Sequence, residues 1–240
     1  LDVSKNTALY TLNCYVNQLT SLDVSANTDL NELDCNSNQL ASLDVSSNTK
    51  LTVLQCHYNY LTSLDVSKNT ALETLYCYNN KLTSLDVSKN TALWTLHCAS
   101  NLLTSLDVSK NTTLSYLDCG GNQLTSLDVS KNTELSLLSV NSNQLTSLDV
   151  SNNKELETLY CSGNQLTSLN MRNGLTDKLD SFYATDNSGL TCIETLDPAY
   201  ATTNWTNIDA GVTFSIICGA TAVTTWHVAT TGSDGSGSGT

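Results

Sequence analysis

Residues 64–84 read LDVSKNTALETLYCYNNKLTS, and variants of this phrase return along the chain at a constant spacing. Copies begin at Leu1, Leu22, Leu43, Leu64, Leu85, Leu106, Leu127 and Leu148, 21 residues apart each time. A ninth, degenerate copy begins at Leu169, where Asn170 and Met171 replace Asp and Val. A unit this short cannot bury its own apolar face, so we expect the copies to stack into a solenoid in which each coil covers the next.

Each unit contains one apolar phrase twice. Leu9-x-x-Leu12-x-Cys14-x-x-Asn17 is followed by Leu19-x-x-Leu22-x-Val24-x-x-Asn27. The alternation of apolar and polar residues has the period of two expected of half-buried strands, and no stretch has a sustained helical period. The pattern resembles the leucine-rich repeats, specifically the short class with nested 21-residue units, over residues 1–193. The resemblance implies a mainly β solenoid of about nine coils with two strand-like segments per coil.

Two columns of Asn recur with the repeat. They are Asn17, Asn38, Asn59, Asn80, Asn101, Asn122, Asn143 and Asn164, and Asn6, Asn27, Asn48, Asn69, Asn90, Asn111, Asn132 and Asn153. An inward amide at a bend can pair loop N–H and C=O groups that would otherwise be buried without partners. We therefore predict a structural role for both columns rather than ligand contact.

Seven of the nine cysteines occupy one position of the repeat. They are Cys14, Cys35, Cys56, Cys77, Cys98, Cys119 and Cys161. Val140 and Ala184 stand in the same position, so it requires a small apolar group rather than a metal-binding or redox-active thiolate. Neighbouring strands are about 4.8 Å apart, too far for the roughly 3.8 Å between the Cβ atoms of a disulfide. We expect free, buried thiols and no metal site.

Cys192 and Cys218 lie outside this column, after the repeats decay, and bracket the only proline, Pro198. The last coil of a solenoid exposes its core and needs a cap, which we place at residues 194–220. A Cys192–Cys218 disulfide would close it and would indicate an oxidising compartment, so we expect a secreted or cell-surface protein. The segment LTCIE…AYATTNWTNIDAGVTFSIIC resembles the terminal cap of repeat proteins secreted by Bacteroidetes-type bacteria.

The two ends of the chain carry further expectations. Leu1 falls inside a repeat without an N-terminal cap, so the first coil is expected to fray. Residues 221–240 run from TTWHVATT into Gly and Ser, as either a linker or the start of a truncated downstream domain. TTWHVATTGSDGSGSGT resembles the opening of bacterial right-handed parallel β-helix domains, some of which are polysaccharide lyases. That resemblance implies an accessory module of a downstream enzyme.

Charge and motifs exclude several functions. Lys and Arg total 10 against 23 Asp and Glu, a net charge of -13, which disfavours nucleic acid and anionic membranes. No apolar run approaches the roughly 20 residues that span a bilayer, so we expect no membrane insertion and a monomer. No hydrolase elbow, phosphate loop or zinc motif is present, so we predict a non-catalytic chain without a cofactor.

The repeated Asp of the LDVS phrase forms a third column, namely Asp2, Asp23, Asp44, Asp65, Asp86, Asp107, Asp128 and Asp149. Stacked carboxylates repel unless something compensates. We expect hydrogen bonds to the following backbone, with Lys residues such as Lys68 nearby, to do so. Bound Ca²⁺ is the alternative, because oxygen-rich columns suit a hard cation.

Variation between coils locates the candidate binding face. The LDVSKNT half hardly changes, whereas the outward positions of the other half vary freely. The third to fifth coils bring aromatic side chains into adjacent rows, at His57, Tyr58, Tyr76, Tyr78, Trp94 and His97. Aromatic rings beside polar groups are typical of sugar recognition, and exposed Tyr and Trp equally anchor protein interfaces. Ordinary β-propensity on an exposed sheet would also explain them. We predict polysaccharide recognition through these residues, with a protein-binding or adhesin role, or a rigid spacer, as the alternatives.

Overall fold

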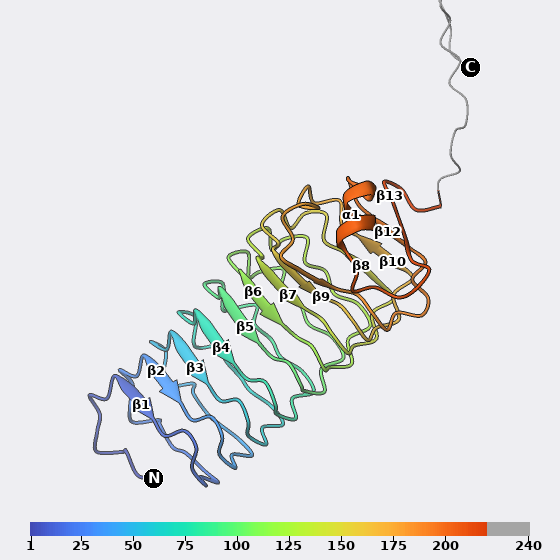
Figure 1. The fold of residues 1–240 in the computed structure, drawn as a ribbon. Coiled ribbons are helices and arrows are strands. Elements are labelled where there is room, and N and C mark those ends of the chain that lie inside the picture. The colour runs from blue at the N-terminus through green and yellow to red at the C-terminus, as the bar shows by residue number, and fades with distance from the viewer. Residues whose placement is uncertain (220–240) are drawn as a thin grey trace, which may run out of the picture.

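The computed structural model describes residues 1–219, which form a parallel β-solenoid (Figure 1). One strand from each of nine coils lies beside the next in a single sheet. These strands are β1 (Thr11–Asn13), β2 (Glu32–Asp34), β3 (Val53–Gln55), β4 (Thr74–Tyr76), β5 (Thr95–His97), β6 (Tyr116–Asp118), β7 (Leu137–Ser139), β9 (Thr158–Tyr160) and β11 (Ser181–Tyr183). Equivalent repeat positions pair across it, as Leu54 with Leu75. The nine-coil solenoid predicted from the repeat spacing is confirmed.

A second, four-stranded sheet occupies the other side of the C-terminal coils. Its strands are β8 (Ser147–Asp149), β10 (Ser168–Asn170), β12 (Cys192–Glu194) and β13 (Thr213–Ser215), in the order β13-β12-β10-β8. Of the two strand-like segments expected in each coil, the second is therefore a β-strand only from β8 onward. In the coils before β8 the N–H groups of the LDVS segment bond within their own coil, as Ser46 to Asp44 at 2.9 Å and Asn48 to Val45 at 3.0 Å. The same two bonds recur in the β8 coil, where the N–H of Val150 in addition donates to the carbonyl of Asn170 in the next coil at 3.0 Å.

The core is a set of columns running along the solenoid. Leu75 and Cys77 are fully buried, while Tyr76 between them faces outward and is half-buried. This is the alternation that a half-buried strand requires. All seven column cysteines are buried and free, as predicted. Burial raises the pKa of their thiols, to about 12 for Cys161, because the interior disfavours a thiolate.

Both asparagine columns are structural, as predicted. Asn38 donates from Nδ2 to the carbonyls of Cys14 and Cys35, at 3.0 Å each, and its Oδ1 accepts from the N–H of Leu19 at 2.9 Å. In the second column Asn48 donates to the carbonyls of Val24 and Asn27 in the preceding coil. Each amide therefore links two successive coils through backbone groups buried at the bends.

The C-terminal end is closed by a cap that contains the single helix of the described residues, α1 (Pro198–Asn204). Asp197 caps this helix by accepting from the N–H of Tyr200 at 3.0 Å, and Pro198 begins it. After the helix, Trp205 packs on Phe182 of the last coil, with ring centroids 4.8 Å apart.

The disulfide expected between Cys192 and Cys218 is present in the cap. Because β12 spans Cys192–Glu194 and β13 pairs with it, the boundary expected at residue 193 falls within a sheet shared by solenoid and cap. The linker or domain start expected at residues 221–240 lies outside the described residues. No helix in residues 1–219 has the length and apolar character needed to cross a membrane.

Candidate binding site

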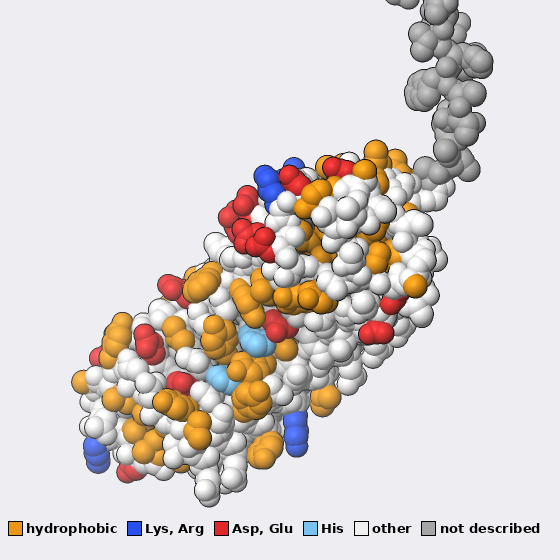
Figure 2. Space-filling view, viewed as in Figure 1, with side chains coloured by type: hydrophobic (Ala, Val, Ile, Leu, Met, Phe, Trp, Pro, Cys, Tyr) orange, Lys and Arg blue, Asp and Glu red, His pale blue; other side chains and the backbone are white. Residues whose placement is uncertain are grey.

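The outer face of the nine-stranded sheet carries the rows in which binding residues were predicted. Five of the six predicted residues meet there, namely His57, Tyr58, Tyr76, Tyr78 and His97, which we call the aromatic cluster. Figure 2 shows histidine side chains set among apolar ones on this face, over the middle of the sheet. In-register pairing of β3 to β6 brings the rows together, since Gln55, Tyr76 and His97 are successive partners.

A stack of three rings forms the centre of the aromatic cluster. Tyr78 lies between His57 and His97, with centroid distances of 4.3 Å and 4.0 Å and interplanar angles of 17° and 21°. Tyr58 meets the Tyr78 ring edge-on at 5.3 Å. Tyr76 is T-shaped to both histidines, at 6.2 Å and 6.1 Å. The rings therefore support one another, and both faces of Tyr78 are covered.

His57 departs from the expectation that the whole row points freely into solvent, because its side chain is only 8% exposed. Its neighbours Tyr58, Tyr76 and Tyr78 cover it on the outer surface of the sheet. Desolvation by these rings lowers the pKa of His57, although the charge of Asp34 acts in the opposite direction. His57 thus serves mainly as a packing support for Tyr78.

His97 is held by a carboxylate of the next coil. Its Nε2 lies 2.9 Å from Oδ2 of Asp118, and both side chains remain partly exposed, at 23% and 18%. Burial opposes ionisation of Asp118, but hydrogen bonds from His97 and from the N–H of Gly120 outweigh it and hold the pKa below its ordinary value. Asp118 therefore remains an anion beside the cluster at neutral pH.

Tyr58 is projected outward by its backbone. Its φ of 51° is left-handed, a conformation that side-chain-bearing residues adopt rarely. The same repeat position has positive φ in the eight other coils, at Val16, Ser37, Asn79, Ser100, Gly121, Ser142, Gly163 and Asp186. The turn is thus a property of the solenoid, and it leaves the Tyr58 ring 53% exposed at the edge of the cluster.

Trp94 is the predicted residue that the structure does not bring to the cluster. It immediately precedes β5 and follows the core residue Leu93, so it lies at the opposite end of that strand from the Tyr78 row. Its side chain is 51% exposed, and no ring contact joins it to another aromatic residue of the described chain. Trp94 is therefore a separate exposed residue.

The Asp column behaves as the hydrogen-bonding prediction requires. Asp86 accepts from the N–H of Ser88 at 2.8 Å, and equivalent bonds recur along the column. These bonds lower the pKa of each carboxylate, since they favour the charged form. No group of three or more His, Cys, Asp or Glu side chains in residues 1–219 is arranged to hold a metal ion.

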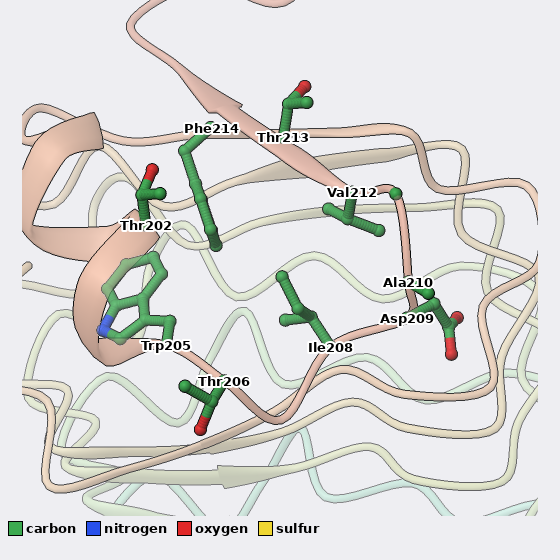
Figure 3. Close-up of a pocket in the computed structure, with 10 residues that line it drawn as sticks. Thr202, Trp205, Thr206, Ile208, Asp209, Ala210, Val212, Thr213 and Phe214 are labelled. Atoms are coloured by element: carbon green, nitrogen blue, oxygen red, sulfur yellow. The ribbon is translucent and has the colours of Figure 1, made fainter.

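A pocket of about 490 Å³ lies in the cap (Figure 3). Trp205, Ile208 and Phe214 form apolar walls, and Trp205 also packs on Phe214 with centroids 5.7 Å apart. The carboxylate at its edge, Asp209, is occupied by the N–H groups of Asp186 and Asn187, at 2.8 Å and 2.7 Å. These hydrogen bonds attach the cap to the last coil, so Asp209 has a structural role.

Comparison with known proteins places this arrangement in context. A family model for leucine-rich repeats in two copies matches residues 49–90. The functional domain of InlJ from Listeria monocytogenes, which includes a cysteine ladder, is 36% identical over 83% of this chain and 53% of that one, with a TM-score of 0.64. No curated protein sequence matches the chain.

Two further solved structures share the fold. The internalin InlF of Listeria monocytogenes is 24% identical over 87% of this chain and 63% of its own, with a TM-score of 0.68. The leucine-rich repeat protein LIC12759 of Leptospira interrogans is 21% identical over 86% and 67%, with a TM-score of 0.65. This chain therefore spans between 53% and 67% of the length of these three proteins.

Proposed function

Since this chain is a leucine-rich repeat solenoid, we propose that it is a non-catalytic, extracellular protein-binding module whose contact surface is the aromatic cluster. The observation that carries the proposal is the stack of His57, Tyr78 and His97, a pre-arranged group of rings on the outer face of the sheet. Aromatic side chains already fixed by their neighbours lose little entropy on binding, which is why they are common at the centres of protein interfaces.

The mutual packing of the rings favours a protein over the polysaccharide predicted first. A sugar ring lies flat against an open aromatic face, whereas His57 and His97 cover both faces of Tyr78. What the cluster offers is ring edges, the Tyr58 side chain and the hydroxyl groups of the tyrosines. This uneven surface can contact the varied side chains of a protein more closely than the flat ring faces of a polysaccharide.

The disulfide between Cys192 and Cys218 supports the extracellular part of the proposal. Disulfides persist in oxidising compartments and are rare where thiols are kept reduced. Solved relatives with this fold include bacterial internalins. We therefore place the module on the cell surface or in the secreted fraction.

Panning a random 12-residue peptide library on the immobilised chain tests the proposal. Selected peptides are expected to bind the wild type and to lose binding to Tyr58→Ala. Tyr10→Ala is the matched control, because Tyr10 is an exposed tyrosine of the first coil, outside the cluster.

A glycan array run with the same proteins separates the rival functions. Glycans that bind the wild type and are lost with Tyr58→Ala would restore the polysaccharide hypothesis. Peptides that bind all three proteins equally would refute the assignment of the face. A chain that retains neither peptides nor glycans would be a spacer.

A further inference from the structure

We propose that the partner of the aromatic cluster is a cationic protein segment, which brings Arg or Lys side chains to the exposed rings and to the carboxylates on either side of them. The inference rests on the proposed function and names the chemistry of the partner. It follows from the charges on the sheet face, from one row of aligned residues and from the contrast between two neighbouring tyrosines.

The outward columns of the nine-stranded sheet contain no Lys or Arg. The three columns begin at Thr11, Asn13 and Tyr15 and continue at each coil to Ser181, Tyr183 and Thr185. All the Lys and Arg of the chain lie elsewhere in the repeat. The acidic side chains in these columns are Glu32, Asp34 and Asp118.

Two of these carboxylates flank the rings in a single row. The pairing of β2 to β6 aligns, one coil after another, Asp34, Gln55, Tyr76, His97 and Asp118. Four strand spacings of about 4.8 Å place the ends of this row roughly 19 Å apart. Asp34 is half-buried and Asp118 is partly exposed, so a ligand laid across the strands meets an anion, then rings, then a second anion.

Two tyrosines of the third coil differ in whether a cation lies over the ring. Tyr58 and Tyr60 are each 53% exposed. The Nζ of Lys81 lies over the Tyr60 ring, 5.3 Å from its centroid, so the chain supplies a cation to that tyrosine. Among the described residues no cation lies over Tyr58. An Arg or Lys from a partner would provide the equivalent contact, which the negative ring face and the nearby carboxylates both favour.

The row also sets the length of the segment. An extended chain advances about 3.3 Å per residue, so roughly six residues cover the distance between Asp34 and Asp118. A segment crossing the strands would therefore place one cation at each carboxylate when its basic residues are six positions apart. Its intervening residues would pass over Tyr76 and the edge of Tyr78.

Synthetic peptides test this directly on the complete chain. The first is a nine-residue Gly-Ser peptide with Arg at positions 2 and 8; the second carries neutral citrulline at both positions; the third carries its two Arg side by side. Fluorescence anisotropy gives the Kd of each. We expect the first peptide to bind about tenfold tighter than the citrulline peptide and tighter than the third, and to weaken between about 50 and about 500 mM salt.

Variants locate the effect on the row. Asp34→Asn should weaken the binding of the first peptide several-fold without disturbing the pair of His97 and Asp118, which it does not touch. Asp86→Asn, on the LDVS side of the coil, should leave the Kd unchanged. Thermal melting of both variants checks that they are folded. Equal binding of the arginine and citrulline peptides, no binding of either at millimolar concentration, or an unaffected Asp34→Asn would each overturn the inference.

The result is separable from the proposed function. Library peptides that depend on Tyr58 but carry no Lys or Arg would leave the protein-binding role standing and remove the cationic partner. A library without any Tyr58-dependent peptide would remove both. Enrichment of basic residues about six positions apart among the Tyr58-dependent peptides would support both.

Discussion

The side chain of Asn59 holds the carbonyl of Cys35, one coil earlier, by an Nδ2 to oxygen hydrogen bond of 3.1 Å. The same amide donates to Cys56 of its own coil and accepts from the N–H of Leu40. Since this pattern repeats along the solenoid, successive coils are coupled by buried amides as well as by apolar contacts. Loss of one amide should therefore remove hydrogen bonds within its own coil and to the preceding coil.

The first prediction is that Asn59→Ala lowers the free energy of unfolding by about 3 kcal/mol. The substitution leaves several backbone groups without a hydrogen-bond partner, and each such buried group costs about 1–3 kcal/mol. Urea denaturation followed by circular dichroism measures the change. Gln39→Ala, at an exposed position, is the control and should change the free energy by less than about 0.5 kcal/mol. A loss below about 1 kcal/mol for Asn59→Ala would show that water or a local shift replaces the amide.

Much of this fold was predictable because each repeat position has one local environment. The alternation of Leu75, Tyr76 and Cys77 indicates which side chain faces the core, and Val140 in the cysteine position indicates an apolar slot. The left-handed turn at Tyr58 was also signalled, since Gly121 and Gly163 occupy its position in later coils. Helix α1 was missed, although Asp197 followed by Pro198 is typical of a helix start.

The candidate site was predictable as a set of rows but not as a packed cluster. Register follows from the repeat, so the adjacency of Tyr76 and His97 could be expected. Which ring lies over which depends on side-chain rotation and on contacts between coils, and these decide that His57 is buried and that Asp118 holds His97. The separation of Trp94 could be expected as well, since its repeat position precedes the strand whereas that of Tyr78 follows it.

The second prediction concerns the thiols. Labelling under denaturing, non-reducing conditions should find seven free cysteines and one disulfide, Cys192–Cys218. Cys77→Ala should lower the free energy of unfolding by about 1–2 kcal/mol through lost burial and a small cavity, and Cys77→Asp far more, because it buries a carboxylate. A disulfide within the column, or a tolerated Cys77→Asp, would contradict the packing role of these side chains.

The third prediction is a loss of stability in acid. Hydrogen bonds from serine N–H groups hold the pKa of Asp65, Asp86, Asp107 and Asp128 below 3.8 in the folded chain. A carboxyl group whose pKa is lowered by folding stabilises the folded state above its unfolded pKa, and that contribution disappears as the pH falls through the folded pKa. Urea midpoints should therefore fall steadily below about pH 4.

Asn at one of these positions is the matched control for the acid prediction. Asp107→Asn keeps an acceptor for the N–H of Ser109 but does not titrate, so its urea midpoint should depend less on pH between about pH 4 and about pH 2 than that of the wild type. Identical pH profiles for the two proteins would show that this carboxylate does not contribute.

The fourth prediction concerns the cap. Replacing Cys192 and Cys218 together by Ser should lower the free energy of unfolding by about 2–4 kcal/mol, the usual effect of removing a disulfide. The loss should be local, because Trp205 on Phe182 and the bonds of Asp209 still attach the cap to the last coil. Hydrogen exchange should therefore increase in β12 and β13 and stay unchanged in β1 to β6. Uniformly faster exchange would refute a separate role for the cap.

The fifth prediction separates the members of the candidate site by their packing. Tyr58→Ala should weaken the binding of a peptide selected on the wild-type chain by about 1–3 kcal/mol, the range of an aromatic anchor, with little loss of stability, because its ring is half exposed. Tyr78→Ala should weaken binding similarly and also destabilise the chain, because the two imidazoles that it separates lose their stacking partner. Isothermal titration and urea denaturation measure the two effects.

Two controls complete the fifth prediction. Trp94→Ala and Asp86→Ala should leave the affinity for the same peptide unchanged, the first because Trp94 lies at the far end of β5 and the second because Asp86 belongs to the LDVS half of the coil. A loss of affinity with Trp94→Ala would extend the site along the strand, as the sequence first indicated. Equal, negligible effects of all four substitutions would exclude the aromatic cluster, and the apolar walls around Trp205 and Phe214 would then be the next surface to test.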